Sequence, residues 1–167
     1  MKIKTLILDK PGEKELFVPF TKEGEEVEVW GLIRGEQAGD YSVKVRVEHK
    51  VGKGAVRIVI RGIAKNGARV RVEGMIKIEK NAQEVDDFLE MRILLLDSKS
   101  QATAEPKLEI EANQVKASHA AVVGRIDKEQ MFYLMSRGLK EKQAEKLIVD
   151  GFLGEVLLKC SEAEIYD

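Results

Sequence analysis

The sequence predicts a mainly β chain that ends in a pair of helices. From about residue 27 to residue 123, short runs alternate apolar and polar residues, which is the period of a half-buried strand. Residues that favour turns separate these runs. From residue 126 onward, the apolar residues recur with the longer period of a helix. These three observations together define the expected fold class.

The strand signal is clearest in residues 43–48, where valines alternate with charged side chains. The same alternation returns in residues 68–73, 76–79 and 107–112. Turn chemistry marks the breaks between the runs, and Asn66-Gly67 is the strongest signal for a tight turn. We therefore expect an all-β segment here.

The local pattern does not choose among a sandwich, a barrel and a solenoid, because all three use many short strands with one charged face. Residues 69–78 are similar to residues 107–116, which favours repeated coils. The period is too irregular to establish a β-helix from the pattern alone.

The first helix is predicted to begin at Asp127, which can cap it, with Gln130 reaching back three residues later. Met131, Leu134 and Met135 then follow at helical spacing, and Gly138 is expected to end the helix.

A second helix is predicted from about residue 140, with its apolar positions on one side at Leu147, Ile148, Phe152 and Val156. The expected organisation is a β core over residues 1–125, a helical hairpin over residues 126–160, and an acidic tail over residues 161–167 that frays.

The composition excludes several classes of partner and compartment. The 28 Lys and Arg residues nearly balance the 29 Asp and Glu residues, so a nucleic acid or an anionic membrane is not expected as the main partner. No apolar stretch reaches the roughly 18 residues of a membrane span, and residues 1–9 are too short and too charged for a signal peptide. We expect a cytoplasmic protein.

The sequence offers no complete metal site or catalytic motif. Cys160 is the single cysteine, and no spacing of Cys and His would hold zinc or a whole iron–sulfur cluster. Any metal must therefore be shared with another chain. A P-loop, a nucleophile elbow and an HExxH helix are all missing, so we expect no enzymatic activity.

Residues 117–138 read ASHAAVVGRIDKEQMFYLMSRG, and this run resembles the C-terminal signature of the SufB/SufD family of iron–sulfur cluster assembly proteins. The similarity extends over residues 74–157. Residues 27–73 resemble the family only in their general strand pattern, and residues 1–26 show no recognisable family motif.

The resemblance implies a parallel β-helix followed by a C-terminal two-helix subdomain. It implies pairing through the β-helix, as a homodimer or with a SufB/SufD-type chain, and docking of the C-terminal helices onto SufC, an ABC-type ATPase. It implies no stably bound cofactor, and at most a transient iron–sulfur cluster shared with a partner. Relatives carry a longer N-terminal helical segment, whereas this sequence starts almost at the strands.

The resemblance makes His119 the main candidate for cluster formation or the protomer interface, because it matches the family's Ser-His motif. Neutral imidazole is a good iron ligand, so His119 is also the tentative metal ligand. The alternative is a structural histidine at a strand end. Ser100 stands where SufB-type chains carry a cysteine, Ala117 where many SufD proteins do, and Ala120 where SufB proteins have glutamate. These differences make the chain more SufD-like.

The candidate contacts with the ATPase are aromatic, methionine, arginine and glutamate side chains of the hairpin, namely Met131, Phe132, Tyr133, Arg137, Phe152 and Glu155. Several large apolar residues within five positions cover more than one helix face, so some should be exposed. The alternative is that they close the end of the β-helix. Cys160 is expected to be a small buried hydrophobe.

Two other functions stay open. One is a degenerate SufD-like structural or regulatory subunit without cluster binding. The other is a carbohydrate-active β-helix enzyme, which has little support because aromatic residues make up 5% of the chain and Trp30 is the only tryptophan.

Overall fold

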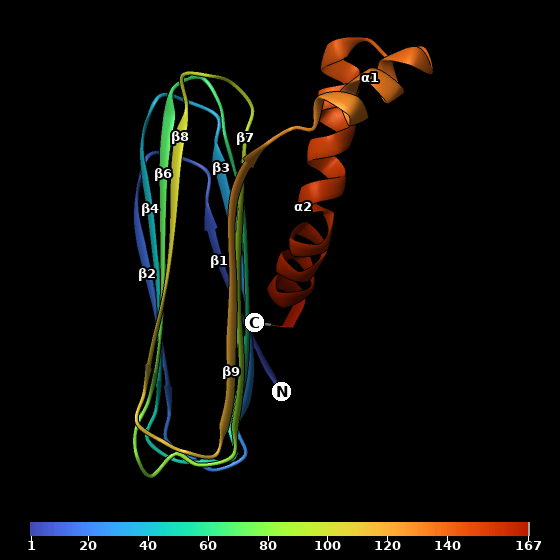
Figure 1. Cartoon of the computed structure of the whole chain (residues 1–167). Coiled ribbons are helices and arrows are strands. Elements are labelled where there is room, and N and C mark those ends of the chain that lie inside the picture. The colour runs from blue at the N-terminus through green and yellow to red at the C-terminus, as the bar shows by residue number, and fades with distance from the viewer. Residues whose placement is uncertain (167) are drawn as a thin grey trace.

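The computed structural model describes the backbone of residues 1–166 and the side-chain surroundings of residues 1–163. The chain forms a parallel β-helix of about four turns, followed by two helices (Figure 1). The elements are β1 (Lys2–Leu8), β2 (Gly12–Phe20), β3 (Glu26–Gly35), β4 (Gly39–His49), β5 (Ala55–Ala64), β6 (Ala68–Ile78), β7 (Val85–Leu95), β8 (Gln101–Ile110), β9 (Val115–Arg125), α1 (Lys128–Ser136) and α2 (Glu141–Tyr166).

The strands form two sheets that face each other. The odd-numbered strands make a five-stranded sheet in the order β1-β3-β5-β7-β9, and the even-numbered strands make a four-stranded sheet in the order β2-β4-β6-β8. Every pair is parallel, and in the five-stranded sheet Val27 pairs with Val56, Val56 with Asp87, and Asp87 with Ala117. Successive coils are therefore 29 to 31 residues apart in this sheet, and the predicted solenoid is confirmed.

The repeat noticed in the sequence has the wrong register. Residues 69–78 and 107–116 do not occupy equivalent places, because Arg69 pairs with Gln101 and Lys107 pairs with Met75. The similar segments are 38 residues apart, whereas β6 and β8 pair 32 residues apart, so the similarity reflects the shared alternation of strands. The turn before β8 spans residues 96–100. In this turn the carboxylate of Asp97 accepts hydrogen bonds from the backbone N–H groups of Asn66, Lys99 and Ser100, at 2.5, 3.0 and 2.8 Å.

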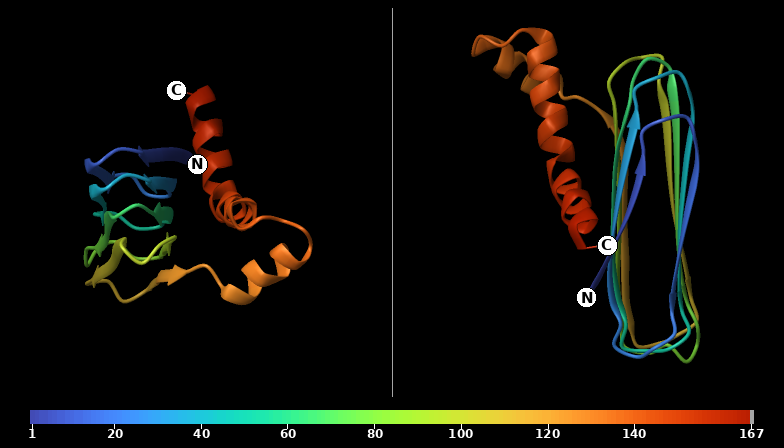
Figure 2. Two further views of the ribbon diagram at one scale, coloured as in Figure 1. Left: turned by 90° about the horizontal axis from the view of Figure 1, so that it is seen from above. Right: turned by 180° about the vertical axis from the view of Figure 1, so that it is seen from behind.

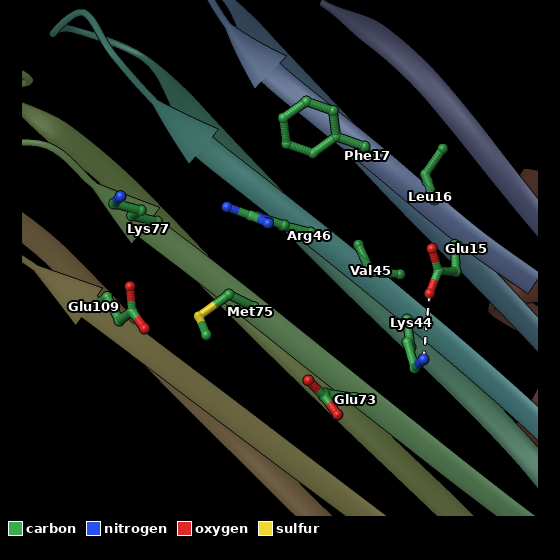
Figure 3. A pocket seen from close by; sticks show the side chains of 10 residues that line it. All are labelled: Glu15, Leu16, Phe17, Lys44, Val45, Arg46, Glu73, Met75, Lys77 and Glu109. Carbon is green, nitrogen blue, oxygen red and sulfur yellow. Dashed lines mark ion pairs between the residues drawn. The ribbon is translucent and has the colours of Figure 1, made fainter.

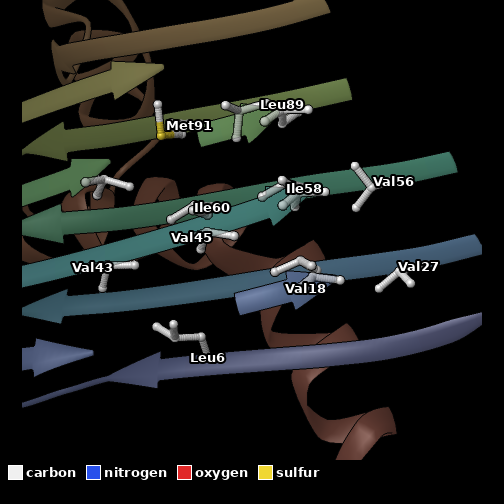
Figure 4. Packing of buried hydrophobic residues seen from close by; sticks show 14 of the residues in the cluster. Leu6, Val18, Val27, Val43, Val45, Val56, Ile58, Ile60, Leu89 and Met91 are labelled. Atoms are coloured by element: carbon white, nitrogen blue, oxygen red, sulfur yellow. The ribbon is translucent and has the colours of Figure 1, made fainter. Parts of the chain in front are cut away.

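The interior of the β-helix is filled by apolar side chains that stack coil upon coil (Figure 4). Val29, Ile58 and Leu89 show the pattern, because they pair in register across β3, β5 and β7 and are fully buried. Side chains in register point to the same face of a parallel sheet, so each coil supplies a row that covers the next. Valine and isoleucine suit such pleated surfaces.

The turns explain where particular backbone conformations are needed. Asn66 and Gly67 adopt φ values of 58° and 81°, which confirms the predicted tight turn. It joins β5 to β6 in the opposite sheet, so it is not a hairpin. Gly52 lies so close to the next coil that an added Cβ would meet the carbonyl oxygen of Gln83 at 2.3 Å. Only glycine fits this approach.

Helix α2 packs against the outer face of the five-stranded sheet (Figures 1 and 2). A second buried cluster forms there, consisting of Trp30, Leu32, Val59, Ile63, Leu153, Val156 and Cys160. The prediction that Cys160 is a small buried side chain is confirmed. Through this cluster, the C-terminal part of α2 packs on the β core.

Two details of the predicted second helix are wrong. Leu147 was expected on the apolar side, but its side chain is 53% exposed, because the face that meets the sheet runs through Leu153, Val156 and Cys160. The segment 161–166, predicted as a frayed tail, continues α2. Asp167 lies outside the described residues.

A buried histidine–aspartate pair, which the sequence did not predict, lies inside the β-helix. Nε2 of His49 is 2.9 Å from Oδ2 of Asp87, and both side chains are fully buried. The ring of Phe20 stacks on His49 with the ring centres 4.0 Å apart, and the other oxygen of Asp87 accepts a hydrogen bond from the backbone N–H of Val56 at 3.0 Å. Burial raises the pKa of Asp87, and the contacts with His49 and Val56 only partly offset this.

This raised pKa gives Asp87 a specific effect on stability. Because folded Asp87 holds its proton more tightly than unfolded Asp87, its contribution is fully present below the ordinary pKa of an aspartate and is lost as the pH rises through the raised value. We predict that the free energy of unfolding of the wild type, relative to Asp87→Asn, falls as the pH rises above about 4, the ordinary pKa of an aspartate. Urea unfolding of both proteins measures it, and a difference that is constant or rises with pH contradicts the assignment.

Candidate functional site

Strand β9 is one edge of the five-stranded sheet within the described residues. Its segment from Ala117 to Gly124 contains no Asp, Glu, Lys or Arg. The side chain of Val122 is 53% exposed and that of Val123 is 39% exposed. An uncharged, apolar strand edge offers unpaired backbone groups to another strand, and many proteins protect such edges with charges or proline. Residues 117–124 lack both, and the charged residues of the strand, Lys116 and Arg125, lie outside this segment.

The same end of the molecule leaves the interior of the β-helix open. Leu89 pairs in register with His119 of β9, so His119 takes the next place in the inward row of Val29, Ile58 and Leu89. No further coil covers it within the described residues, and His119 is exposed. Its imidazole makes no hydrogen bond or ion pair inside the described part of the chain, so it is free to bind a ligand at this open end.

The other positions compared with the family are not gathered around His119. The hydroxyl of Ser100 accepts a hydrogen bond from the backbone N–H of Gly67 at 3.1 Å and is buried in the turn before β8. Arg125 donates to the backbone carbonyl of Asp97 in that turn at 2.9 Å. Because Arg125 is six residues beyond His119, Ser100 is about 20 Å from His119 along β9.

The remaining two positions on β9 add no ligand. Ala117 is half-buried on the inward face, and Ala120 pairs in register with Glu90 on the outward face. Among the described residues, no three or more His, Cys, Asp or Glu side chains are grouped so that they could hold a metal ion. Of the positions matched to the family, Ser100, Ala117, His119 and Ala120, only His119 therefore offers a candidate ligand at the open end.

Helix α1 begins as predicted, with the carboxylate of Asp127 accepting a hydrogen bond from the backbone N–H of Glu129 at 2.9 Å. None of its residues is buried. Phe132 is 75% exposed and Tyr133 is 55% exposed, and the guanidinium of Arg137 lies 5.3 Å from the Tyr133 ring centre. The expectation that part of this apolar set is exposed is confirmed, and these two aromatic rings do not close the β-helix.

A cleft of about 470 Å³ lies between α1 and α2 near the ends of β7 and β9. Its lining is largely apolar and includes Leu94, Ile126, Leu134, Ile148 and Phe152. Met131 is half-buried beside the exposed residues of α1. The exposed aromatic rings do not line this cleft, but both belong to the same hairpin, so the hairpin offers two apolar features that a protein partner could cover.

The outer face of the four-stranded sheet carries a second groove, of about 540 Å³ (Figure 3). Phe17, Arg46 and Met75 lie in register across it. Around them the charges compensate each other. Lys44 is 2.8 Å from Glu13, and contacts with Glu13 and then Glu15 raise the pKa of Lys44.

The compensation continues on the next strands. Glu73 is 3.0 Å from Lys107, which lowers the pKa of Glu73. The groove therefore shows no preference for an anion or a cation. Its paired carboxylates add no support for a carbohydrate-active enzyme, whose carboxylates must be available to the substrate.

The profile of the SUF system FeS cluster assembly, SufBD core domain matches residues 10–152. The chain belongs to the SufBD family. It is 38% identical over 124 residues to the iron–sulfur cluster assembly protein SufD of Bacillus subtilis, which covers 74% of the chain and 28% of that protein. It is 32% identical over 156 residues to an iron–sulfur cluster assembly SufBD family protein of Mycobacterium tuberculosis, which covers 89% of the chain and 39% of that protein.

The SufBD chain thus spans less than two fifths of the length of these relatives. The similarity begins earlier than the sequence motifs indicated, because the family profile starts at residue 10. In the described part of the chain, no helix combines the length and the apolar character needed to cross a membrane.

Phe152 and Glu155, two of the hairpin residues predicted to contact the ATPase, have partners inside this SufBD chain. Arg61 of β5 donates one hydrogen bond to the backbone carbonyl of Phe152 at 2.9 Å and another to the carboxylate of Glu155 at 2.8 Å. The Arg61 guanidinium also lies 5.8 Å from the centre of the Phe152 ring. Sequence reasoning missed Arg61, because nothing in a strand pattern shows which outward arginine lies beneath a helix.

Proposed function

We propose that this chain is a non-enzymatic scaffold or accessory subunit of SUF iron–sulfur cluster assembly and that it acts in the cytoplasm. The match of residues 10–152 to the SufBD core domain carries this proposal. The open β-helix end and the exposed hairpin give the chain two separate surfaces on which partners could assemble. In this role the iron–sulfur cluster is cargo.

The hairpin is the proposed docking surface for a SufC-type ABC ATPase. Phe132 and Tyr133 are large, exposed and adjacent, and Arg137 lies against the Tyr133 ring. Aromatic and arginine side chains dominate the binding energy of protein interfaces when they become buried at their centre. Phe152 and Glu155 already contact Arg61, so we assign them to holding α2 rather than to direct docking.

Truncation of the exposed rings should weaken this complex. We predict that Phe132→Ala and Tyr133→Ala each raise the dissociation constant for the ATPase by about 30-fold, because each removes a buried aromatic contact. Isothermal titration calorimetry with the purified ATPase measures this change.

The matched control for docking is Glu129→Gln, another exposed position on α1 that is not aromatic. It should bind almost as tightly as the wild type. If the wild-type chain shows no complex with the ATPase, or if the aromatic variants bind like Glu129→Gln, the hairpin is not the docking surface.

The β9 edge is the proposed surface for pairing with a second β-helix, from this chain or from a SufB/SufD-type chain. Backbone groups of β9 could continue a sheet across the interface, and the exposed Val122 and Val123 would be covered. Val122 lies beside Arg92 of β7 in register, so an acidic side chain there would have a partner in the folded monomer.

A charge at this edge should block pairing without preventing folding. We predict that Val122→Glu raises the dissociation constant of the pair by about tenfold or more, because pairing would bury a charge. Phe17→Glu is the control, since Phe17 is similarly half-exposed but lies on β2 at the opposite end. Sedimentation velocity of the chain, alone and mixed with a SufB-type chain, gives the result. Equal effects of both substitutions would exclude β9 as the specific interface.

His119 is the proposed ligand that this chain contributes to the iron–sulfur cluster. It lies at the open end of the interior row, and its imidazole has no partner inside the described residues. Because a single imidazole cannot hold a cluster, the partner must supply the other ligands.

We predict that His119→Ala lowers the iron and sulfide retained by the reconstituted complex several-fold while pairing and ATPase binding stay unchanged. Metal analysis after gel filtration provides the measurement, with Ser118→Ala as the neighbouring control. Retention that does not depend on His119 would favour a SufD-like structural or regulatory subunit without cluster binding.

A further inference from the structure

Arg61 connects the β-helix to α2 through partners on both. Its side chain lies on the outer face of β5 and is only 16% exposed. It holds the backbone carbonyl of Phe152 and the carboxylate of Glu155 on α2. The same guanidinium is also 3.5 Å from Oε1 of Glu90 on β7. The arginine therefore has a strong set of acceptors on the helix and a longer contact on the sheet.

Glu90 gives Arg61 an acceptor that does not depend on the helix. The side chain of Glu90 is 12% exposed, and its other oxygen is 3.3 Å from Arg92 on the same strand. Release of an arginine from its only buried carboxylate is costly, because it leaves an unpaired charge. Here Glu90 remains beside Arg61 when the backbone carbonyl of Phe152, at the start of the packed half of α2, turns away from it. The loss of this hydrogen bond therefore costs less than the loss of an isolated ion pair.

Helix α2 has both of its glycines at the segment that Arg61 contacts. Gly151 and Gly154 flank Phe152, and glycine both lowers helix stability and allows a helix to bend. Seen from above, the first part of α2 appears nearly end-on and the last part appears from the side (Figure 2). The helix thus changes direction along its length, and Arg61 binds the backbone carbonyl of Phe152 between the two glycines.

The two halves of α2 are held differently. Beyond residue 152, Leu153, Val156 and Cys160 are buried against the sheet. Before it, Leu147 is 53% exposed, and an ion pair between Lys65 and Glu145 reaches the end of β5. The C-terminal half of the helix is therefore fixed by three buried side chains, whereas the N-terminal half has fewer apolar contacts, made by the buried Ala144 and the half-buried Val149, and adds polar contacts.

We propose that Arg61 is a latch that sets the angle of residues 128–151 on the β-helix by exchanging between α2, through Phe152 and Glu155, and Glu90. Residues 128–151 contain α1 with its exposed aromatic rings, so the latch positions that surface. The latch follows from contacts within this chain. Only its consequence for ATPase docking rests on the proposed function.

The latch predicts that substitutions of Glu155 and Glu90 change the hydrogen exchange of residues 141–151 in opposite directions. Glu155→Gln removes the negative charge that holds Arg61 in the docked state and leaves only a weaker amide acceptor, so we expect backbone amides of residues 141–151 to exchange hydrogen about tenfold faster. Glu90→Gln removes the charge that serves the released state, so exchange in the same segment should slow several-fold. Amides of residues 156–160 should change little in both variants. Hydrogen exchange of the whole chain, followed by mass spectrometry, measures all three segments without any partner.

Asp150→Asn is the matched control, because it breaks the exposed ion pair between Lys146 and Asp150 within α2 and leaves the sheet contacts intact. Its effect should be about twofold or less. If Glu155→Gln and Glu90→Gln change exchange in the same direction, or if neither exceeds the control, Arg61 is an ordinary stabilising contact and the latch is excluded.

Arg61→Lys covers the case in which Glu90→Gln does not fold. A lysine keeps the charge but cannot reproduce the planar fork that reaches both Phe152 and Glu155. It should speed exchange in residues 141–151 and leave β5 and β7 unchanged. Faster exchange throughout the β-helix, or no change in residues 141–151, overturns the proposal. ATPase binding by the Phe132 and Tyr133 variants tests docking separately, so the two failures are distinguishable.

Discussion

The in-register stacking of inward side chains is the interaction on which the whole molecule depends. No coil of the β-helix has a core of its own, because Val29 is covered by Ile58 and Ile58 by Leu89 in the next coils. At the last coil, His119 takes the next place in this inward row, and no further coil covers it within the described residues. The same physical rule that makes the interior stable leaves β9 with an apolar edge and an exposed imidazole.

Helix α2 uses the outer face of the five-stranded sheet in a different way. Trp30, Val59 and Val156 form part of a second buried cluster, whose buried helix residues all lie in the C-terminal half of α2, while Val149 of the N-terminal half packs against it half-buried. The N-terminal half and α1 extend beyond it, so α1 buries none of its residues. Apolar packing thus fixes the hairpin at one end, while Arg61 and Lys65 supply polar contacts nearer the other.

The placement of the few chemically active side chains fits a subunit that completes a site rather than one that contains it. Cys160 of α2 is buried between the helix and the sheet, and the hydroxyl of Ser100 is hydrogen-bonded in the turn before β8. Neither lies at the open end with His119. In the proposed assembly, a pairing β-helix would both cover the exposed edge and bring the missing ligands, because iron–sulfur clusters require several protein ligands. One pairing partner would therefore meet both needs, a cover for the exposed edge and further ligands for the cluster.

The sequence by itself determined the strand alternation, the Asn66-Gly67 turn, the Asp127 cap and the change to helical period near residue 126, because each depends on neighbours along the chain. The family motif further identified the solenoid and directed attention to His119. Only the tertiary structure decided the register, in which Arg69 of β6 pairs with Gln101 of β8. It also decided the buried His49–Asp87 pair, the exposure of Leu147 and the contacts of Arg61 with Glu155 and Glu90. These features join residues from different coils or from the sheet and the helix, and a local period carries no information about which distant side chains meet.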